Sequence, residues 1–68
     1  MGEEFHAFLV MPENARWMKT TARTHEMAYR QQCCWFSPNT RIAVMDCETR
    51  ETVVYIGREN DGTPIVWD

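Results

Sequence analysis

The side chains in this chain that could do chemistry are the adjacent cysteines Cys33 and Cys34, a third cysteine, Cys47, and the histidine His25. Thiolate and imidazole ligands suit Zn²⁺, but structural zinc pairs are usually separated by about two to four residues, so that one turn presents both sulfurs. Neighbouring residues on a helix instead point about 100° apart. The spacing disfavours a metal site, and we expect Cys34 to be a small core residue and Cys33 to be half exposed.

Catalysis by a thiol or an imidazole is no better supported. Cys33 and Cys34 fall in the last turn of a predicted helix, where the helix dipole disfavours a thiolate. His25 lies at the start of that helix without an identifiable carboxylate partner, and we interpret His6 as a strand residue with a solvated ring. Glycine-rich phosphate loops, paired-carboxylate motifs and nucleophile elbows are missing from the sequence. We predict no enzyme activity and no cofactor, with a thiol or metal enzyme as the disfavoured alternative.

Basic side chains are concentrated in the middle of the chain. Residues 16–41 hold five cations and one acid, whereas residues 1–15 hold three acids and no base, and residues 42–68 hold six acids and two bases. Interleaved aromatic residues make this segment resemble one that neutralises phosphates and stacks on bases. The candidate binding residues are Arg16, Lys19, Arg23, Tyr29 and Arg30. The net charge of -3 counts against nucleic acid, and Trp17 and Trp35 are explained more simply as core residues.

Length and composition bound the architecture. Sixty-eight residues predict a single domain spanning residues 1–68, and a chain of this size buries only about 60% of its unfolded surface. The apolar share of 44%, with three tryptophans, predicts a folded chain rather than a disordered one. We therefore expect one thin core and no cofactor cavity.

Three features favour a soluble cytoplasmic protein. No apolar run approaches the roughly 18 residues that a membrane span needs. The N-terminus lacks the basic region and apolar stretch of a secretory signal. The odd number of cysteines predicts reduced thiols rather than a disulfide framework. We expect no membrane association.

One segment, Thr24–Phe36, has the pattern of a helix. Thr24 is a favourable N-cap residue and Glu26 lies in the first turn, where the dipole favours a carboxylate. The helix should end before Pro38, because the residue preceding a proline is pushed out of helical geometry. A projection at about 100° per residue puts Tyr29 and Arg30 outside. The same projection predicts that the inner face of the helix carries Met27, Ala28, Gln31, Cys34 and Trp35.

The remaining segments have strand and turn patterns. Pro12–Ala15 and Asn60–Gly62 have turn chemistry. A strand that contains Pro64 should lie at a sheet edge, because proline donates no hydrogen bond to a ladder. The expected strands are Phe5–Met11, Arg16–Ala22, Arg41–Asp46, Thr52–Gly57 and Pro64–Trp67. We predict an α+β fold of order ββαβββ, with a single helix packed on a mainly antiparallel sheet of four or five strands.

This architecture predicts an uncovered sheet face. A helix of 13 residues is roughly 20 Å long and about 10–12 Å across, whereas four or five strands span about 19–24 Å. One helix cannot cover such a sheet. We expect the uncovered face to meet a second copy, giving a homodimer, or another partner.

The chain from about residue 20 onward resembles a known family. Its order of elements is similar to that of some small phage-encoded anti-CRISPR proteins, which have one helix on an antiparallel sheet. The similar features are the lead-in Thr21-Ala22, a helix ending in Gln32-Cys33 with aromatic residues, a strand hairpin, and the terminal Asp61-Gly62 and Trp67-Asp68. The resemblance covers roughly residues 20–68 and its motifs are unspecific. It implies an inhibitor that binds a surveillance complex tightly without catalysis. Members of that type can be more basic than this chain, so the resemblance carries over no nucleic-acid contacts.

Taken together, these features predict a small non-enzymatic binding protein that docks on a protein or nucleoprotein partner. The alternative is a nucleic-acid-binding module that uses the basic central segment.

Overall fold

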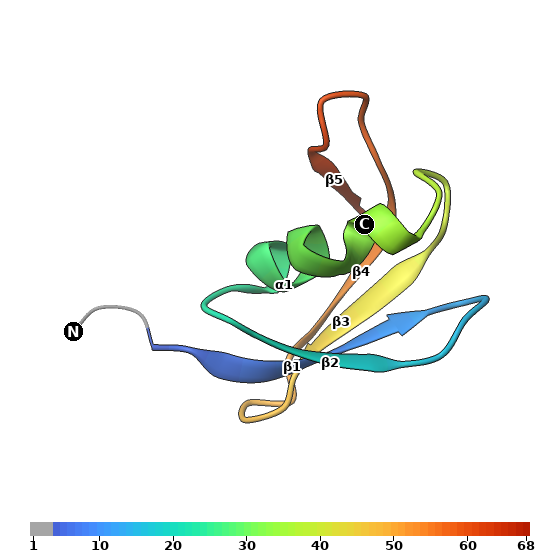
Figure 1. Cartoon of the computed structure of the whole chain (residues 1–68). Helices are drawn as coiled ribbons and strands as arrows, with labels where there is room; N and C mark the ends of the chain where they lie inside the picture. Colours follow the sequence, from blue (N-terminus) through green and yellow to red (C-terminus); the bar gives the residue numbers. More distant parts are fainter. Residues whose placement is uncertain (1–3) are drawn as a thin grey trace.

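The computed structural model describes residues 4–68 as one helix and five strands (Figure 1). The elements are β1 (His6–Pro12), β2 (Met18–Ala22), α1 (His25–Gln32), β3 (Ile42–Asp46), β4 (Thr52–Arg58) and β5 (Pro64–Val66). The predicted order ββαβββ and the α+β class are confirmed. Glu3, one of the N-terminal acids counted above, lies outside the described residues, as does the start of the segment in which a secretory signal was sought.

All five strands form a single antiparallel sheet of order β2-β1-β3-β4-β5. The hairpins β1–β2 and β3–β4 are joined side by side, because β1 pairs with β3 in the register Phe8 to Asp46 through Pro12 to Ile42. β5 is an edge strand that begins at Pro64, as the missing N–H of proline predicts. Figure 1 shows that the sheet is strongly twisted.

The two faces of the sheet are different. Side chains alternate along a strand, so one face carries Phe8 and Val10 of β1 and the other carries Leu9 and Met11. Helix α1 lies on the first side only (Figure 1), and we call that side the covered face. Its fully buried strand residues include Phe8, Val10, Ile42 and Val44. We call the opposite side the open face.

The start of the helix agrees with the prediction. Thr24 is the N-cap, and its hydroxyl accepts a hydrogen bond of 3.1 Å from the main-chain N–H of Met27. The regular helix ends at Gln32, four residues earlier than expected, and a 3₁₀ turn over Cys33–Trp35 follows before the chain straightens at Phe36.

The predicted inner face of the helix is correct at Ala28 but wrong at its other positions. Ala28 and Tyr29 are the buried helix residues, and Tyr29 is only 1% exposed, whereas Met27 is exposed. Cys34 is also exposed, which contradicts its predicted place in the core, whereas Cys33 is partly exposed as expected and packs against the core. The helix carries apolar side chains on both sides, so periodicity alone does not fix its rotation. The rotation is set by the ring of Tyr55, whose centroid lies 4.7 Å from that of Tyr29.

The expectation that Trp17 and Trp35 belong to the core is also wrong. Their exposed fractions are 62% and 73%. The buried positions on the covered face are filled by smaller rings and aliphatic side chains, of which Phe8, Tyr29 and Ile42 are among the largest. The tryptophans are therefore surface residues on both layers of the molecule, since Trp17 precedes β2 and Trp35 follows α1.

The segment that leads from the helix to β3 is attached to β4. The main-chain N–H of Arg58 donates to the carbonyl of Pro38 at 2.9 Å, and the Arg58 guanidinium donates to the carbonyl of Phe36 at 2.8 Å. A Cβ atom at Gly57 would lie 2.5 Å from the Pro38 carbonyl oxygen. Gly57 therefore permits the close backbone approach that holds this connection in place.

Candidate functional site

The described residues 4–68 form no detected pocket and no cluster of three or more side chains that could hold a metal ion. All three cysteines are free thiols. No helix in this part of the chain has the length and apolar character required to cross a membrane. Two arrangements of side chains are organised enough to consider as sites: the open face of the sheet, and a histidine–carboxylate cluster at one end of the covered face.

An apolar row crosses the full width of the open face. Met11 of β1 pairs with Ala43 of β3, and Ala43 pairs with Val54 of β4. Trp67 continues the row beside β4, since its N–H donates to the carbonyl of Val54 at 2.8 Å. At the other edge Trp17 precedes Met18, whose pairing with Val10 places Trp17 opposite Met11. We call Trp17, Met11, Ala43, Val54 and Trp67 the apolar row.

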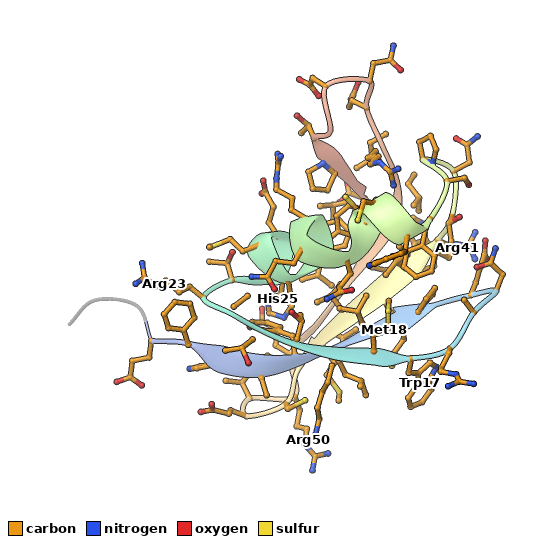
Figure 2. All side chains as sticks on the ribbon, in the orientation of Figure 1. Trp17, Met18, Arg23, His25, Arg41 and Arg50 are labelled. Atoms are coloured by element: carbon orange, nitrogen blue, oxygen red, sulfur yellow. The ribbon has the colours of Figure 1, made fainter. Side chains whose placement is uncertain are left out.

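The two tryptophans at the ends of the row are the most accessible parts of it. Trp17 and Trp67 are 62% and 58% exposed, while the three residues between them are partly exposed. Figure 2 shows Trp17 and its neighbour Met18 on opposite sides of β2, with Met18 on the side of α1. Leu9 and Met45, which pair with each other next to the row, extend it along β1 and β3.

Cations surround this apolar surface. Lys19 pairs with Leu9 across β1 and β2. Arg41 precedes the buried Ile42 and so faces the open side, where its guanidinium carbon lies 5.7 Å from the centroid of the Trp67 ring. Arg23 directly follows β2 and Phe5 directly precedes β1, next to the terminal pair His6–Ala22, and the Arg23 guanidinium carbon lies 4.6 Å from the centroid of the Phe5 ring. Within residues 4–68, none of these three cations has a carboxylate within 4.0 Å of its charged side-chain nitrogens.

The candidate binding residues from the sequence are divided among these places. Lys19 and Arg23 lie on the open face, and Arg16 is an exposed neighbour of Trp17. Arg30 lies on α1, on the other side of the sheet, in a pair with Glu26 whose Nε–Oε2 distance is 3.0 Å. Tyr29 is buried in the core, so its predicted outward position is wrong.

Several residues of the open face were missed by the sequence reasoning. Arg41 was counted among the basic residues but not selected, and Leu9, Met11 and Met45 were assigned to a strand without a role. Strand alternation could have placed these residues on the open face, because each has an odd number and lies next to a buried even-numbered residue. Trp67, at the end of the chain, had no such local pattern.

The second arrangement is a hydrogen-bonded pair between His6 and Asp46. The Nδ1 atom of His6 lies 2.8 Å from Oδ2 of Asp46, and its Nε2 atom lies 3.8 Å from Oε1 of Glu48. The other carboxylate oxygen of Asp46 accepts the N–H groups of Glu48 and Thr49 in the β3–β4 turn. The His6 ring is therefore held by a partner rather than solvated, which corrects the sequence interpretation.

This pair changes the pKa of both groups. The hydrogen bond to Asp46, with the nearby negative charges, raises the pKa of His6 above its ordinary value. The same hydrogen bond lowers the pKa of Asp46, and the N–H donors of the turn act in the same direction. Both shifts favour a protonated His6 next to an ionised Asp46. The pair joins the start of β1 to the end of β3.

The surroundings of the pair are structural in character. The rings of His25 and Phe8 form a T-shaped contact, with centroids 5.0 Å apart, and His25 Nε2 lies 2.9 Å from the carbonyl oxygen of Glu51. His6 also stacks loosely on Phe8, with centroids 6.4 Å apart. Each polar atom that defines this cluster thus contacts another part of the same chain. The open face has the stronger claim as a binding site.

Comparison with protein-family models, with curated proteins and with solved structures gives no match to this chain.

Proposed function

We propose that this chain is a small non-enzymatic binding protein that docks on a protein or nucleoprotein partner through the open face of its sheet. The observation that carries the proposal is the apolar row, which ends in two exposed tryptophans. Exposed apolar residues that are contiguous, unlike scattered ones, mark surfaces that bind partners.

The composition of the open face supports docking. Tryptophan and arginine are enriched at the energetically important positions of protein interfaces, where they combine large contact area with directional polar groups. The face has partly exposed aliphatic side chains at its centre and cations at its edges, including Lys19 and Arg41. That order, an apolar centre inside a charged rim, is typical of protein-binding surfaces.

The resemblance to small phage-encoded anti-CRISPR proteins is compatible with this function. It implies an inhibitor that acts by tight binding to a surveillance complex, encoded by a phage or another mobile element. The three free cysteines are consistent with the cytoplasmic location that belongs to the same proposal.

Nucleic-acid binding is the second candidate, and one observation favours it. Trp17 is exposed next to Arg16 and Lys19, and an aromatic ring beside cations is a platform on which bases stack. The opposing observation is the overall charge of -3, which repels a polyanion at long range.

Capture from a native host lysate tests the proposal when variants are compared. The variant W17A/W67A removes both ends of the apolar row, and Trp35→Ala removes a tryptophan of greater exposure on the helix layer. We expect the wild type and Trp35→Ala to retain the same partner and W17A/W67A to lose it. Equal retention by all three proteins would contradict docking through the open face.

Nuclease treatment and sedimentation separate the classes of partner. A retained protein that survives nuclease is a protein partner, and one that is released belongs to a nucleic-acid or nucleoprotein complex. Sedimentation of the purified chain at about 50 μM tests self-association, since a homodimer through the open face would be dissociated in W17A/W67A.

A further inference from the structure

Resting on the proposed docking function, we infer the chemistry of the partner: the open face fits an acidic protein surface with an apolar centre. Charge complementarity supports this choice of partner. The chain carries a net charge of -3, yet the open face carries the opposite sign.

The strand register gives the charge of this face. Lys19 lies on it in the register, and Arg23 and Arg41, which adjoin the ends of β2 and β3, lie on it by strand alternation. Glu13, which follows β1, is the only acid that the same alternation places there among the described residues, and its carboxylate accepts the main-chain N–H of Arg41 at 3.3 Å. The carboxylates of Asp46 and Glu26 belong to the other side of the sheet. A protein that is acidic overall thus presents a basic surface where its apolar residues are exposed.

These cations are available to a partner. Arg30 on α1 is paired with Glu26, whereas no carboxylate of residues 4–68 lies within 4.0 Å of the charged side-chain nitrogens of Lys19, Arg23 or Arg41. Each arginine of the three instead lies over an aromatic ring, which positions its guanidinium without neutralising its charge. Acidic side chains of a partner would supply the missing counter-charges at the rim of the apolar row.

A second copy of the chain fits this face less well. Two open faces brought together would oppose three cations with three cations, and one Glu13 from each copy cannot pair with all of them. Like charges across an interface oppose association. The face therefore selects against its own copy.

Single-stranded nucleic acid also fits less well than an acidic protein. The rings of Phe5 and Trp67 each have one side covered by an arginine of the same chain, which removes that side as a stacking platform. Between the edge tryptophans the surface is aliphatic, formed by residues such as Met11 and Val54. Aliphatic side chains suit the apolar residues of a protein better than a ladder of bases.

Three probes distinguish these partners in an NMR titration of the isotope-labelled full chain at about 50 mM salt. They are a short amphipathic helical peptide of leucine and glutamate, the same peptide with every glutamate replaced by lysine, and an oligothymidylate. We expect the glutamate peptide to shift open-face amides and the indole N–H signals of Trp17 and Trp67, with an affinity at least about tenfold above the other probes.

Matched charge variants complete the test. K19Q/R23Q/R41Q should weaken the glutamate peptide about tenfold, and Arg30→Gln should leave its affinity unchanged. Equal binding of both peptides on the open face would overturn the acidic assignment and leave the docking proposal standing. Tighter binding of the oligothymidylate would overturn it in favour of nucleic acid. Binding of no probe to the open face at about 1 mM would overturn both proposals.

Discussion

The two faces of the sheet use the same strands for different purposes. The covered face packs against α1 and carries the fully buried strand residues, including Phe8, Val10 and Val44. The open face shows alternate residues of the same strands to solvent, with a tryptophan at each edge. One layer of backbone thus supports a core on one side and, on the other, the exposed apolar surface through which we propose that this chain of 68 residues docks.

The two faces should differ most in how far a substitution on each lowers the free energy of unfolding. Phe8 and Phe5 are three residues apart, but Phe8 is buried on the covered face and Phe5 is exposed on the open side. Phe8→Ala should lower the free energy of unfolding by about 3–5 kcal/mol through lost burial and a cavity. Phe5→Ala should cost less than about 1 kcal/mol. Urea titrations followed by circular dichroism measure both, and equal losses would erase the distinction between the faces.

The next effect comes from the attachment of the helix layer to β4. Gly57→Ala should destabilise the fold by about 1–3 kcal/mol, because the added methyl group meets the main-chain oxygen of Pro38. Ile56, its neighbour, is exposed, so Ile56→Ala is the matched change and should cost less than about 1 kcal/mol. Thermal unfolding of the two variants compares them directly. A stable Gly57→Ala protein would show that the connection moves freely.

The pH dependence of stability tests the His6–Asp46 pair. Because the folded pKa of His6 is raised, its contribution is complete below its unfolded pKa and is lost as the pH rises through the raised value. Because the folded pKa of Asp46 is lowered, its contribution is present above its unfolded pKa and is lost as the pH falls through the lowered value. Stability should therefore be greatest between about pH 4 and pH 6.5.

Two variants show whether this pair causes the alkaline decline. His6→Gln removes the titrating ring, and Asp46→Asn removes the charge while keeping an oxygen that can accept the N–H of Glu48. Either change should flatten the decline in unfolding midpoint between about pH 6 and pH 8. An unchanged decline in both variants would assign it to other groups.

The smallest effect concerns the hydroxyl of Tyr29. This buried hydroxyl has no hydrogen-bond partner among residues 4–68. Tyr29→Phe removes a buried polar group without losing a hydrogen bond, so stability should stay the same or rise by up to about 1 kcal/mol. Tyr29→Ala, which also removes the ring, should lose about 3–5 kcal/mol. A clear loss in the phenylalanine variant would mean that the hydroxyl is satisfied in solution.

Elements of the covered face could be predicted where they depend on residues that are close together in the sequence. The Thr24 cap, the hairpin from Thr52 and the edge strand at Pro64 follow from residues close together in the sequence. The rotation of the helix could not be predicted, because it depends on the contact of Tyr29 with Tyr55 from another element. His6 and Asp46 are separated by 40 positions, so their hydrogen bond has no local signature.

The open face was predicted only in outline. The dimensions of one helix and four or five strands required an uncovered side, but not the residues that occupy it. The apolar row depends on three strand registers, and Trp67 joins it through a hydrogen bond to Val54. Trp17 was expected inside the core, although the strand alternation that exposes it was visible in the sequence.

Hydroxyl-radical footprinting of the free chain and of the complex retained from the lysate tests the central claim most directly. Methionine and tryptophan are present on both sides of the sheet, with Met11 and Trp17 on the open face and Met27 and Trp35 on the helix layer. We expect the complex to protect Met11, Met45, Trp17 and Trp67 and to leave Met27 and Trp35 as reactive as in the free chain. Protection centred on Met27 and Trp35 would contradict the account, because the partner would then bind the helix and not the open face.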